Sequence, residues 1–121
     1  MSKKILLVDD EEEIIFLLKR RFIKNGYDVV EAHSGVEAIA CVEKERPDLI
    51  VLDVMMPGMN GLEVCRKLKS DPQYQSIKIV LLTAKDQQKD KELGKEAGAD
   101  AYMTKPFEPD DIIGKVKSLV G

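Results

Sequence analysis

Short apolar runs bounded by turn-forming residues recur along the chain, as expected where strands alternate with helices. Each run is too short for a helix and is mostly β-branched or leucine-rich, so each predicts a buried strand. The runs span residues 5–8, 27–30, 49–52, 77–82 and 99–103. Strands that are apolar almost throughout are typical of a parallel sheet covered on both faces.

The segments between these runs carry apolar residues at helical spacing, and local signals mark where the helices begin and end. Asn25-Gly26 ends the first helical segment, and Pro47 stops the second. Ser34 followed by Glu37 predicts a capping box at the start of the second segment. Pro109 suits the first turn of the last helix.

This alternation predicts an α/β fold in which a doubly wound, five-stranded parallel sheet has the order 2-1-3-4-5, a flavodoxin-like (βα)5 arrangement. A length of 121 residues fits one domain, so we expect a single unit over residues 1–121. The fourth helix, at about residues 86–97, is an exception because Leu93 is its only large apolar residue and Gly94 follows it. It is either a solvated surface helix or a mobile element whose position a switch biases.

The composition narrows the possible partners. A net charge of −3 gives no general attraction to nucleic acid or to an anionic membrane, so we expect neither as a direct partner. No apolar run approaches the roughly 20 residues of a membrane-spanning helix. Met1-Ser2-Lys3-Lys4 leads into only a short apolar run, so we expect no signal peptide and a cytoplasmic location.

The two cysteines and the histidine are read as structural residues. Cys41 and Cys65 lack the paired spacing of a zinc site or a dithiol motif, so both are expected to be reduced packing residues. His33 is the only histidine, which leaves no second member for a histidine-based metal site. We expect it to lie in a loop.

Acidic side chains follow two strands that the predicted sheet order places side by side. Asp9 and Asp10 follow the first strand, and Asp53 ends the third. Ligands of such sheets bind at the carboxyl ends of the strands, where the strand order reverses. Like charges in one cleft repel unless a cation compensates them, and an all-oxygen site open to water suits Mg²⁺. The sequence therefore predicts a Mg²⁺ site here.

The other strand ends add groups suited to phosphoryl chemistry. Strand four finishes at Thr83, and strand five runs through Tyr102 to Lys105. A carboxylate can attack phosphorus, while Lys105 neutralises phosphoryl oxygens and Thr83 donates a hydrogen bond to one of them. Each residue alone has a simpler explanation, such as a helix cap, a surface residue or, for Tyr102, a core residue. The combination at four strand ends favours an aspartyl-phosphate on Asp53.

Four segments extend this pattern along the whole chain: LLVDDE at 6–11, DLIVLDVMMPGMNGLEVCRKL at 48–68, IVLLTA at 79–84 and GADAYMTKPF at 98–107. With them the chain resembles the receiver domain of bacterial two-component response regulators. The resemblance implies that Asp53 is the phosphoacceptor and that Lys105-Pro106 is a cis peptide bond. It also implies that Mg²⁺ is bound by Asp10, Asp53 and the Met55 backbone carbonyl, with help from Asp9. Lys105 would contact the phosphoryl group. Thr83 and Tyr102 would form the switch pair.

The resemblance also implies partners. The donor is a phosphohistidine on a sensor histidine kinase or a phosphotransfer protein, and the receiver supplies only the groups that catalyse its own phosphorylation and dephosphorylation. Phosphorylation shifts the face made by helix four, strand five and helix five, which changes affinity for a downstream protein, an attached output domain or a second copy. Ala101 replaces an acid that many DNA-binding relatives use to dimerise, which argues against that ion-pair scheme.

Met55 and Lys85 occupy positions that influence acyl-phosphate hydrolysis in the family. An apolar Met55 cannot orient an attacking water, so we expect a long-lived phosphorylated form.

Three alternatives share parts of this pattern. A flavin-binding protein of this fold needs a small or glycine-rich loop after strand one, whereas this chain has Asp9-Asp10 followed by glutamates. A phosphatase acting through aspartyl-phosphate typically has a second acid two residues after its nucleophile, where this chain has Met55. The third alternative is a receiver-like interaction scaffold that never accepts phosphate.

Overall fold

Strands and helices alternate along the chain in the computed structural model, which describes residues 2–84 and 88–121. The strands are β1 (Lys4–Val8), β2 (Asp28–Ala32), β3 (Leu49–Asp53), β4 (Lys78–Ala84) and β5 (Ala101–Lys105). The helices are α1 (Glu12–Lys24), α2 (Gly35–Glu45), α3 (Gly61–Lys69), α4 (Gln88–Ala97) and α5 (Pro109–Val120). The predicted alternation is confirmed.

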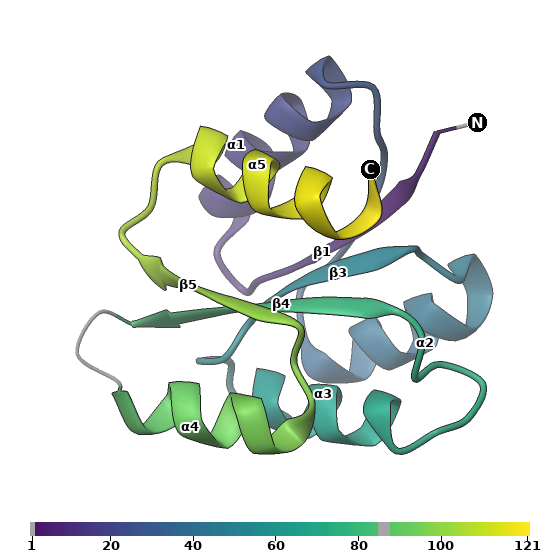
Figure 1. Cartoon of the computed structure of the whole chain (residues 1–121), viewed down its shortest axis with the longest axis vertical. Coiled ribbons are helices and arrows are strands. Elements are labelled where there is room, and N and C mark those ends of the chain that lie inside the picture. The colour runs from purple at the N-terminus through teal and green to yellow at the C-terminus, as the bar shows by residue number, and fades with distance from the viewer. Residues whose placement is uncertain (1, 85–87) are drawn as a thin grey trace.

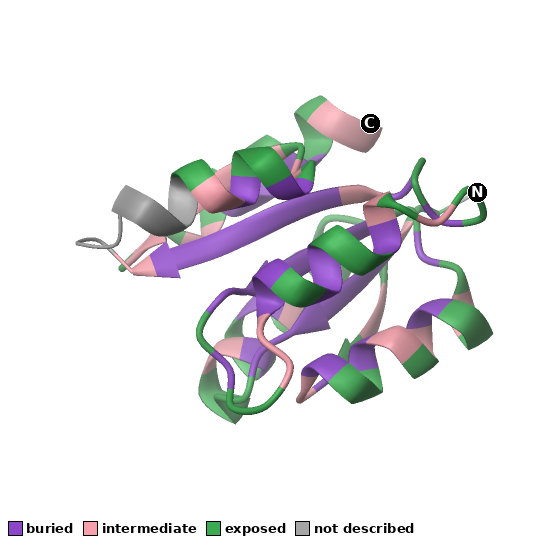
Figure 2. Ribbon diagram, turned by 90° about the horizontal axis from the view of Figure 1, so that it is seen from below, coloured by how far each residue is buried: buried purple, intermediate pink, exposed green. Residues whose placement is uncertain are grey.

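All strand pairs are parallel, and the sheet order is β2-β1-β3-β4-β5. The predicted fold class and strand order are therefore confirmed. Figure 1 shows the sheet as the middle layer, with α1 and α5 on one face and α2, α3 and α4 on the other. Figure 2, seen from below, shows buried strands and helices that are buried mainly along the side facing the sheet.

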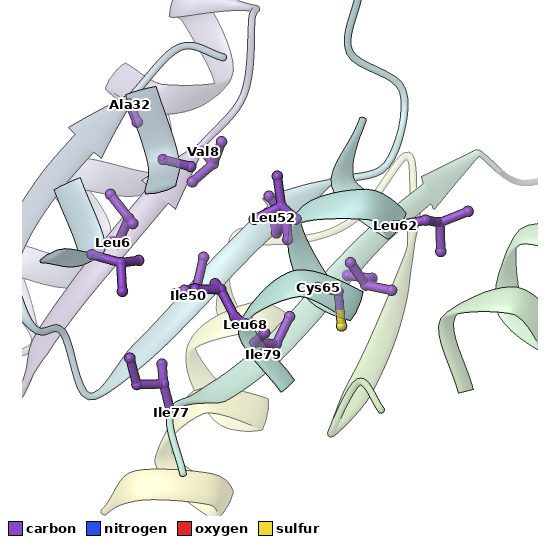
Figure 3. Close-up of a cluster of buried hydrophobic side chains, with 14 of the residues drawn as sticks. Leu6, Val8, Ala32, Ile50, Leu52, Leu62, Cys65, Leu68, Ile77 and Ile79 are labelled. Carbon is purple, nitrogen blue, oxygen red and sulfur yellow. The ribbon is translucent and has the colours of Figure 1, made fainter. Parts of the chain in front are cut away.

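The central strands divide their side chains between two cores. One core contains Leu6, Ile50 and Ile79 and is covered by side chains of α2 and α3, part of which Figure 3 shows. The residues just before or after them on the strands, such as Ile5 and Val80, belong to the second core under α1 and α5. Burial on both faces explains why these strands read as continuous apolar runs.

Local signals fix most element ends as predicted. The Ser34 side chain accepts a hydrogen bond from the Glu37 backbone N–H and starts α2, while α5 begins at Pro109. A capping box between Asn60 and Glu63, which our sequence analysis missed although it has the expected spacing, starts α3. The Lys105-Pro106 peptide bond is cis, as the resemblance implied.

Three predicted strands start too early, and the fourth strand does so by one residue because β4 begins at Lys78. The second strand begins at Asp28 because Tyr27 packs edge-on against Phe22, with ring centroids 5.6 Å apart, and donates its hydroxyl hydrogen bond to the Gly121 carbonyl. The fifth strand begins at Ala101 because the Ala99 N–H still bonds to the carbonyl of Gly94 in α4. Tyr27 and Ala99 are both packed into or against the hydrophobic cores, which explains the apolar signal before each strand.

Among the α4 residues whose side chains the structure describes, 92–97, few contact the sheet. Ala97 is buried, Leu93 is partly buried against the first core, and Gly94 lies close to the Leu81 side chain. This sparse apolar contact agrees with the sequence pattern.

Candidate functional site

The carboxyl ends of β1 and β3 meet at one edge of the sheet, the edge towards which the arrowheads of β4 and β5 point in Figure 1. Val8 pairs with Leu52, so the next residues, Asp9 and Asp53, are brought side by side. The Asp9 backbone N–H donates to the carbonyl of Ala32 at the end of β2, which fixes the start of the following loop. Parallel pairing thus places residues from distant parts of the chain at one point.

The carboxylates of Asp9, Asp10 and Asp53 form one cluster. One oxygen of each lies within 4.8 Å of the others. Asp9 and Asp53 are buried, whereas Asp10 is exposed. The structure therefore brings together the three acids that the sequence analysis singled out, with one of them open to solvent.

Lys105, the last residue of β5, supplies the positive charge of the site. Its Nζ atom lies 3.0 Å from Asp9 Oδ2 and 3.4 Å from Asp53 Oδ1. Burial alone lowers the pKa of Lys105, but the hydrogen bond to Asp9 and the negative charge of Asp53 outweigh it, so the pKa is raised. Lys105 is therefore a firmly charged partner for the two buried acids.

The site changes the titration of Asp53. Burial and, next, the charge of Asp9 raise its pKa from 3.8 to about 6, while the charge of Lys105 and the Met55 backbone N–H, 3.3 Å from Oδ1, lower it and only partly offset the rise. Asp53 is thus ionised at neutral pH at a cost in free energy. Any further positive charge placed beside Asp53 favours the ionised form.

Asp9 is held by two contacts in different directions. Its Oδ1 accepts a hydrogen bond of 2.9 Å from the Glu11 backbone N–H, and its Oδ2 accepts one of 3.0 Å from Lys105. The Glu11 carboxylate also lies 3.8 Å from Lys105 Nζ. Our sequence analysis gave Glu11 no role in the site and missed this contact, although its place directly after Asp9-Asp10 was a usable signal.

Thr83 and Tyr102 lie on the side of the sheet covered by α4. Thr83 is fully buried, and no hydrogen-bond partner for its Oγ1 exists among the described residues. Tyr102 is partly exposed, and its ring lies close to Gly94 of α4. Thr83 lies in β4, which continues to Ala84, one residue beyond the predicted end. Lys85, expected to influence hydrolysis, is outside the described residues.

The donor set fits a hard divalent cation. The three acids offer carboxylate oxygens, which Mg²⁺ prefers as ligands. Because Asp10 faces solvent, water can complete the octahedral shell of the cation. Burial and, next, the charge of Asp9 raise the pKa of Asp53 in spite of the nearby Lys105, so a bound cation would stabilise the ionised carboxylate. Met55 is placed beside Asp53 through its backbone N–H, while its side chain is 61% exposed.

Comparison with known proteins decides the family. The response regulator receiver domain family matches residues 5–117. The chain belongs to this family. Its members are signalling domains that histidine kinases phosphorylate and that bind Mg²⁺ at an acidic pocket. The cluster of Asp9, Asp10 and Asp53 is the candidate for this pocket in the chain.

Individual receivers are similar along the whole chain. The alkaline phosphatase synthesis transcriptional regulatory protein PhoP of Bacillus subtilis (strain 168) is 52% identical over 120 residues, which cover 99% of this chain and 49% of that protein. The chain thus spans about half the length of this relative. Across residues 2–84 and 88–121, no helix has the length and apolar character to cross a membrane.

Solved structures of receivers agree with the fold. The signal receiver domain of a histidine kinase from Syntrophus aciditrophicus is 35% identical, with a TM-score of 0.92 and coverage of 98% of this chain and 90% of that one. The chemotaxis protein CheY4 of Vibrio cholerae is 32% identical, with a TM-score of 0.92 and coverage of 99% of this chain and 100% of that one.

Proposed function

We propose that residues 1–121 act as one receiver unit that accepts a phosphoryl group on Asp53 from a sensor histidine kinase or a phosphotransfer protein. The observation that carries this proposal is the placement of a buried carboxylate, Asp53, 3.4 Å from a lysine ammonium group and beside two further acids. Asp53 is buried, and its pKa is raised to about 6, mainly by that burial. We therefore assign it the role of nucleophile.

The transfer step uses the ionised form of Asp53. A carboxylate oxygen of Asp53 attacks phosphorus, the bond from phosphorus to the donor's imidazole nitrogen breaks, and the imidazole leaves with the electron pair and takes up a proton. Because the pKa of Asp53 is about 6, the attacking form predominates at neutral pH. Lys105 Nζ, already within 3.4 Å of the carboxylate, is placed to pair with a phosphoryl oxygen.

We assign the Mg²⁺ ligands to Asp10, Asp53 and the Met55 carbonyl, with Asp9 acting mostly through water. Bound Mg²⁺ would neutralise charge that develops on the phosphoryl oxygens. Asp9 fits the indirect role because both of its oxygens already hold protein groups. Asp10 fits a direct role because it is exposed and lies within the carboxylate cluster.

We further propose that Thr83 and Tyr102 report the state of Asp53 to the face formed by α4, β5 and α5. The hydroxyl of Thr83, which has no hydrogen-bond partner in the part of the chain that the structure describes, would donate to a phosphoryl oxygen. The Tyr102 ring would turn inward into the space that Thr83 leaves. A downstream protein, an attached output domain or a second copy of the chain would bind that face. We place this signalling in the cytoplasm, without direct contact between this unit and nucleic acid.

The test is phosphorylation by a small phosphodonor, an acyl phosphate or phosphoramidate, in the presence of Mg²⁺. Intact-protein mass spectrometry should show one added phosphoryl group, which is lost in Asp53→Ala and after chelation of the metal. A protein that gains nothing under these conditions would instead be a receiver-like interaction scaffold.

A further inference from the structure

The loop of residues 54–60 leaves the phosphoacceptor strand and returns to it. It starts after Asp53 and ends where α3 begins at Gly61. The Gly61 backbone N–H donates to the Val54 carbonyl at 3.1 Å, and the Met56 N–H donates to the same carbonyl at 3.2 Å. The two ends of the loop therefore touch each other directly behind Asp53.

Gly61 makes this closure possible because it lacks a side chain. A Cβ atom at this position would lie 2.9 Å from the Asp53 carbonyl carbon and closer still to the Asp53 carbonyl oxygen. Real Cβ atoms essentially never come so near to other heavy atoms. The atoms in the way belong to the backbone of the phosphoacceptor itself, so they cannot rotate aside as the end of a side chain can.

A second glycine supports the same loop from another helix. Gly35 is the first residue of α2 and is buried. A Cβ atom here would lie 2.9 Å from the Cβ of Met59 and closer still to the Met59 carbonyl oxygen. The start of α2 is thus packed directly against the far part of the loop.

We propose that Gly35 and Gly61 are positioning residues for the phosphoacceptor, because together they fix the loop that follows Asp53 at two points. The inference rests on the proposed role of Asp53. A side chain at either position pushes the loop backbone, which carries the Met55 N–H and carbonyl and is continuous with Asp53. The push moves the Asp53 carboxylate relative to Lys105 Nζ, 3.4 Å away, and to the Met55 N–H, 3.3 Å away.

The chain contains a matched control for this idea. Gly114 lies inside α5, and a Cβ atom there would meet nothing within 4 Å. Gly35, Gly61 and Gly114 are all helical, and none has a positive φ. Because alanine favours a helix over glycine, any loss on substitution at Gly35 or Gly61 reports the contact and not the backbone conformation.

The experiment compares Gly35→Ala, Gly61→Ala and Gly114→Ala with the parent chain in two assays. In the metal-free protein, hydrogen exchange at the Val54 and Met56 amides should accelerate in the first two variants and stay unchanged in Gly114→Ala. With Mg²⁺ and a small phosphodonor, the phosphorylation rate should fall about tenfold or more in Gly61→Ala, less in Gly35→Ala, and not in Gly114→Ala. Far-ultraviolet circular dichroism checks that each variant is folded.

The inference would be overturned if Gly35→Ala and Gly61→Ala exchanged their loop amides and accepted phosphate at the same rates as Gly114→Ala. It would also be overturned if these two variants were less stable but kept the hydrogen-exchange and phosphorylation rates of the parent chain. If Gly35→Ala or Gly61→Ala does not fold alone, it is repeated in the Gly114→Ala background, and failure to fold there also overturns the inference, because the contact would then serve the whole fold. If the parent chain takes no phosphate, the proposed function fails, while the metal-free exchange assay still tests the two glycines.

Discussion

Lys105 Nζ lies 3.4 Å from Asp53 Oδ1 although the strands that carry these residues are not neighbours. Strand β4 lies between β3 and β5, so the Lys105 side chain reaches across the end of β4 to meet Asp53. The same ammonium group contacts Asp9 at the end of β1. One flexible side chain thus links strand ends across the sheet, and it does so beside Asp53, whose pKa is raised to about 6.

The charge balance of this pocket predicts how stability depends on pH. The pKa of Asp53 is about 6 in the folded protein, whereas the ordinary value for an aspartate is 3.8. The folded state therefore holds this proton more tightly than the unfolded state does. Stability therefore falls as the pH rises through this interval, and the full penalty applies above it. Without metal at about pH 7, Asp53→Asn should raise the free energy of unfolding by about 1–2 kcal/mol.

Urea denaturation with a chelator present measures this effect, and the gain should be clearly smaller at about pH 5. Asp28→Asn, at an exposed acid that starts β2, is the control and should change little. A less stable Asp53→Asn protein, or a gain that is the same at both pH values, would contradict the assigned charge balance.

Binding of Mg²⁺ should stabilise the fold through Asp10. A ligand that binds only the native state adds about 1.4 kcal/mol at ten times its dissociation constant. We expect this gain in the parent chain and its loss in Asp10→Asn, since Asp10 is the exposed member of the acid cluster. Thermal unfolding over a Mg²⁺ titration measures it, with Glu12→Gln on α1 as the control that should keep the response. An undiminished response in Asp10→Asn would remove Asp10 from the ligand set.

The buried hydroxyl of Thr83 should cost stability in the unphosphorylated protein. Thr83 Oγ1 finds no partner among the described residues, and an unpaired buried polar atom is unfavourable. Thr83→Val keeps the shape and removes the hydroxyl, so we expect about 1 kcal/mol of added stability by urea denaturation. Thr104→Val, at the paired position on β5, is the control because Thr104 is only partly buried. Destabilisation by Thr83→Val would mean that the hydroxyl already has a partner.

The exposed side chain of Met55 predicts a long-lived phosphorylated form. It offers no group that can orient water for attack on the acyl phosphate, and it is 61% exposed. Met55→Asn should accelerate dephosphorylation by about tenfold, less than a fully positioned general base would give. The decay of the phosphorylated mass after removal of the donor measures the rate. Val36→Asn, which changes another exposed apolar residue, is the control and should not change the dephosphorylation rate. Equal dephosphorylation rates in the parent chain, Met55→Asn and Val36→Asn would refute the role of Met55.

Much of the fold follows from local sequence signals. Strands buried on both faces produce continuous apolar runs, and parallel strands place their carboxyl ends at one edge, so the meeting of Asp9, Asp10 and Asp53 is predictable. The predicted strand starts were wrong where an apolar residue next to the strand packs against another part of the chain. Tyr27 packs against Phe22. A pattern of apolar residues cannot distinguish such a packing residue from a residue of the strand that follows.

Other features depend on tertiary contacts that no spacing rule describes. Glu11 meets Lys105 at 3.8 Å only because the residue that precedes α1 and the end of β5 lie close together in the fold. The need for glycine at positions 35 and 61 comes from the backbone of a loop elsewhere in the chain, not from a turn at the glycine itself. Contacts of this kind become visible only when all elements are in place.

The most direct test of the central claim is to locate the phosphoryl group. The chain is incubated with a small phosphodonor and Mg²⁺, the acyl phosphate is reduced with borohydride, and the peptides are sequenced by mass spectrometry. Reduction converts a phosphorylated aspartate to homoserine, and we predict homoserine at position 53 alone. Homoserine at Asp9 or Asp10 in place of position 53, or at no position although the intact mass shows phosphorylation, would contradict the account.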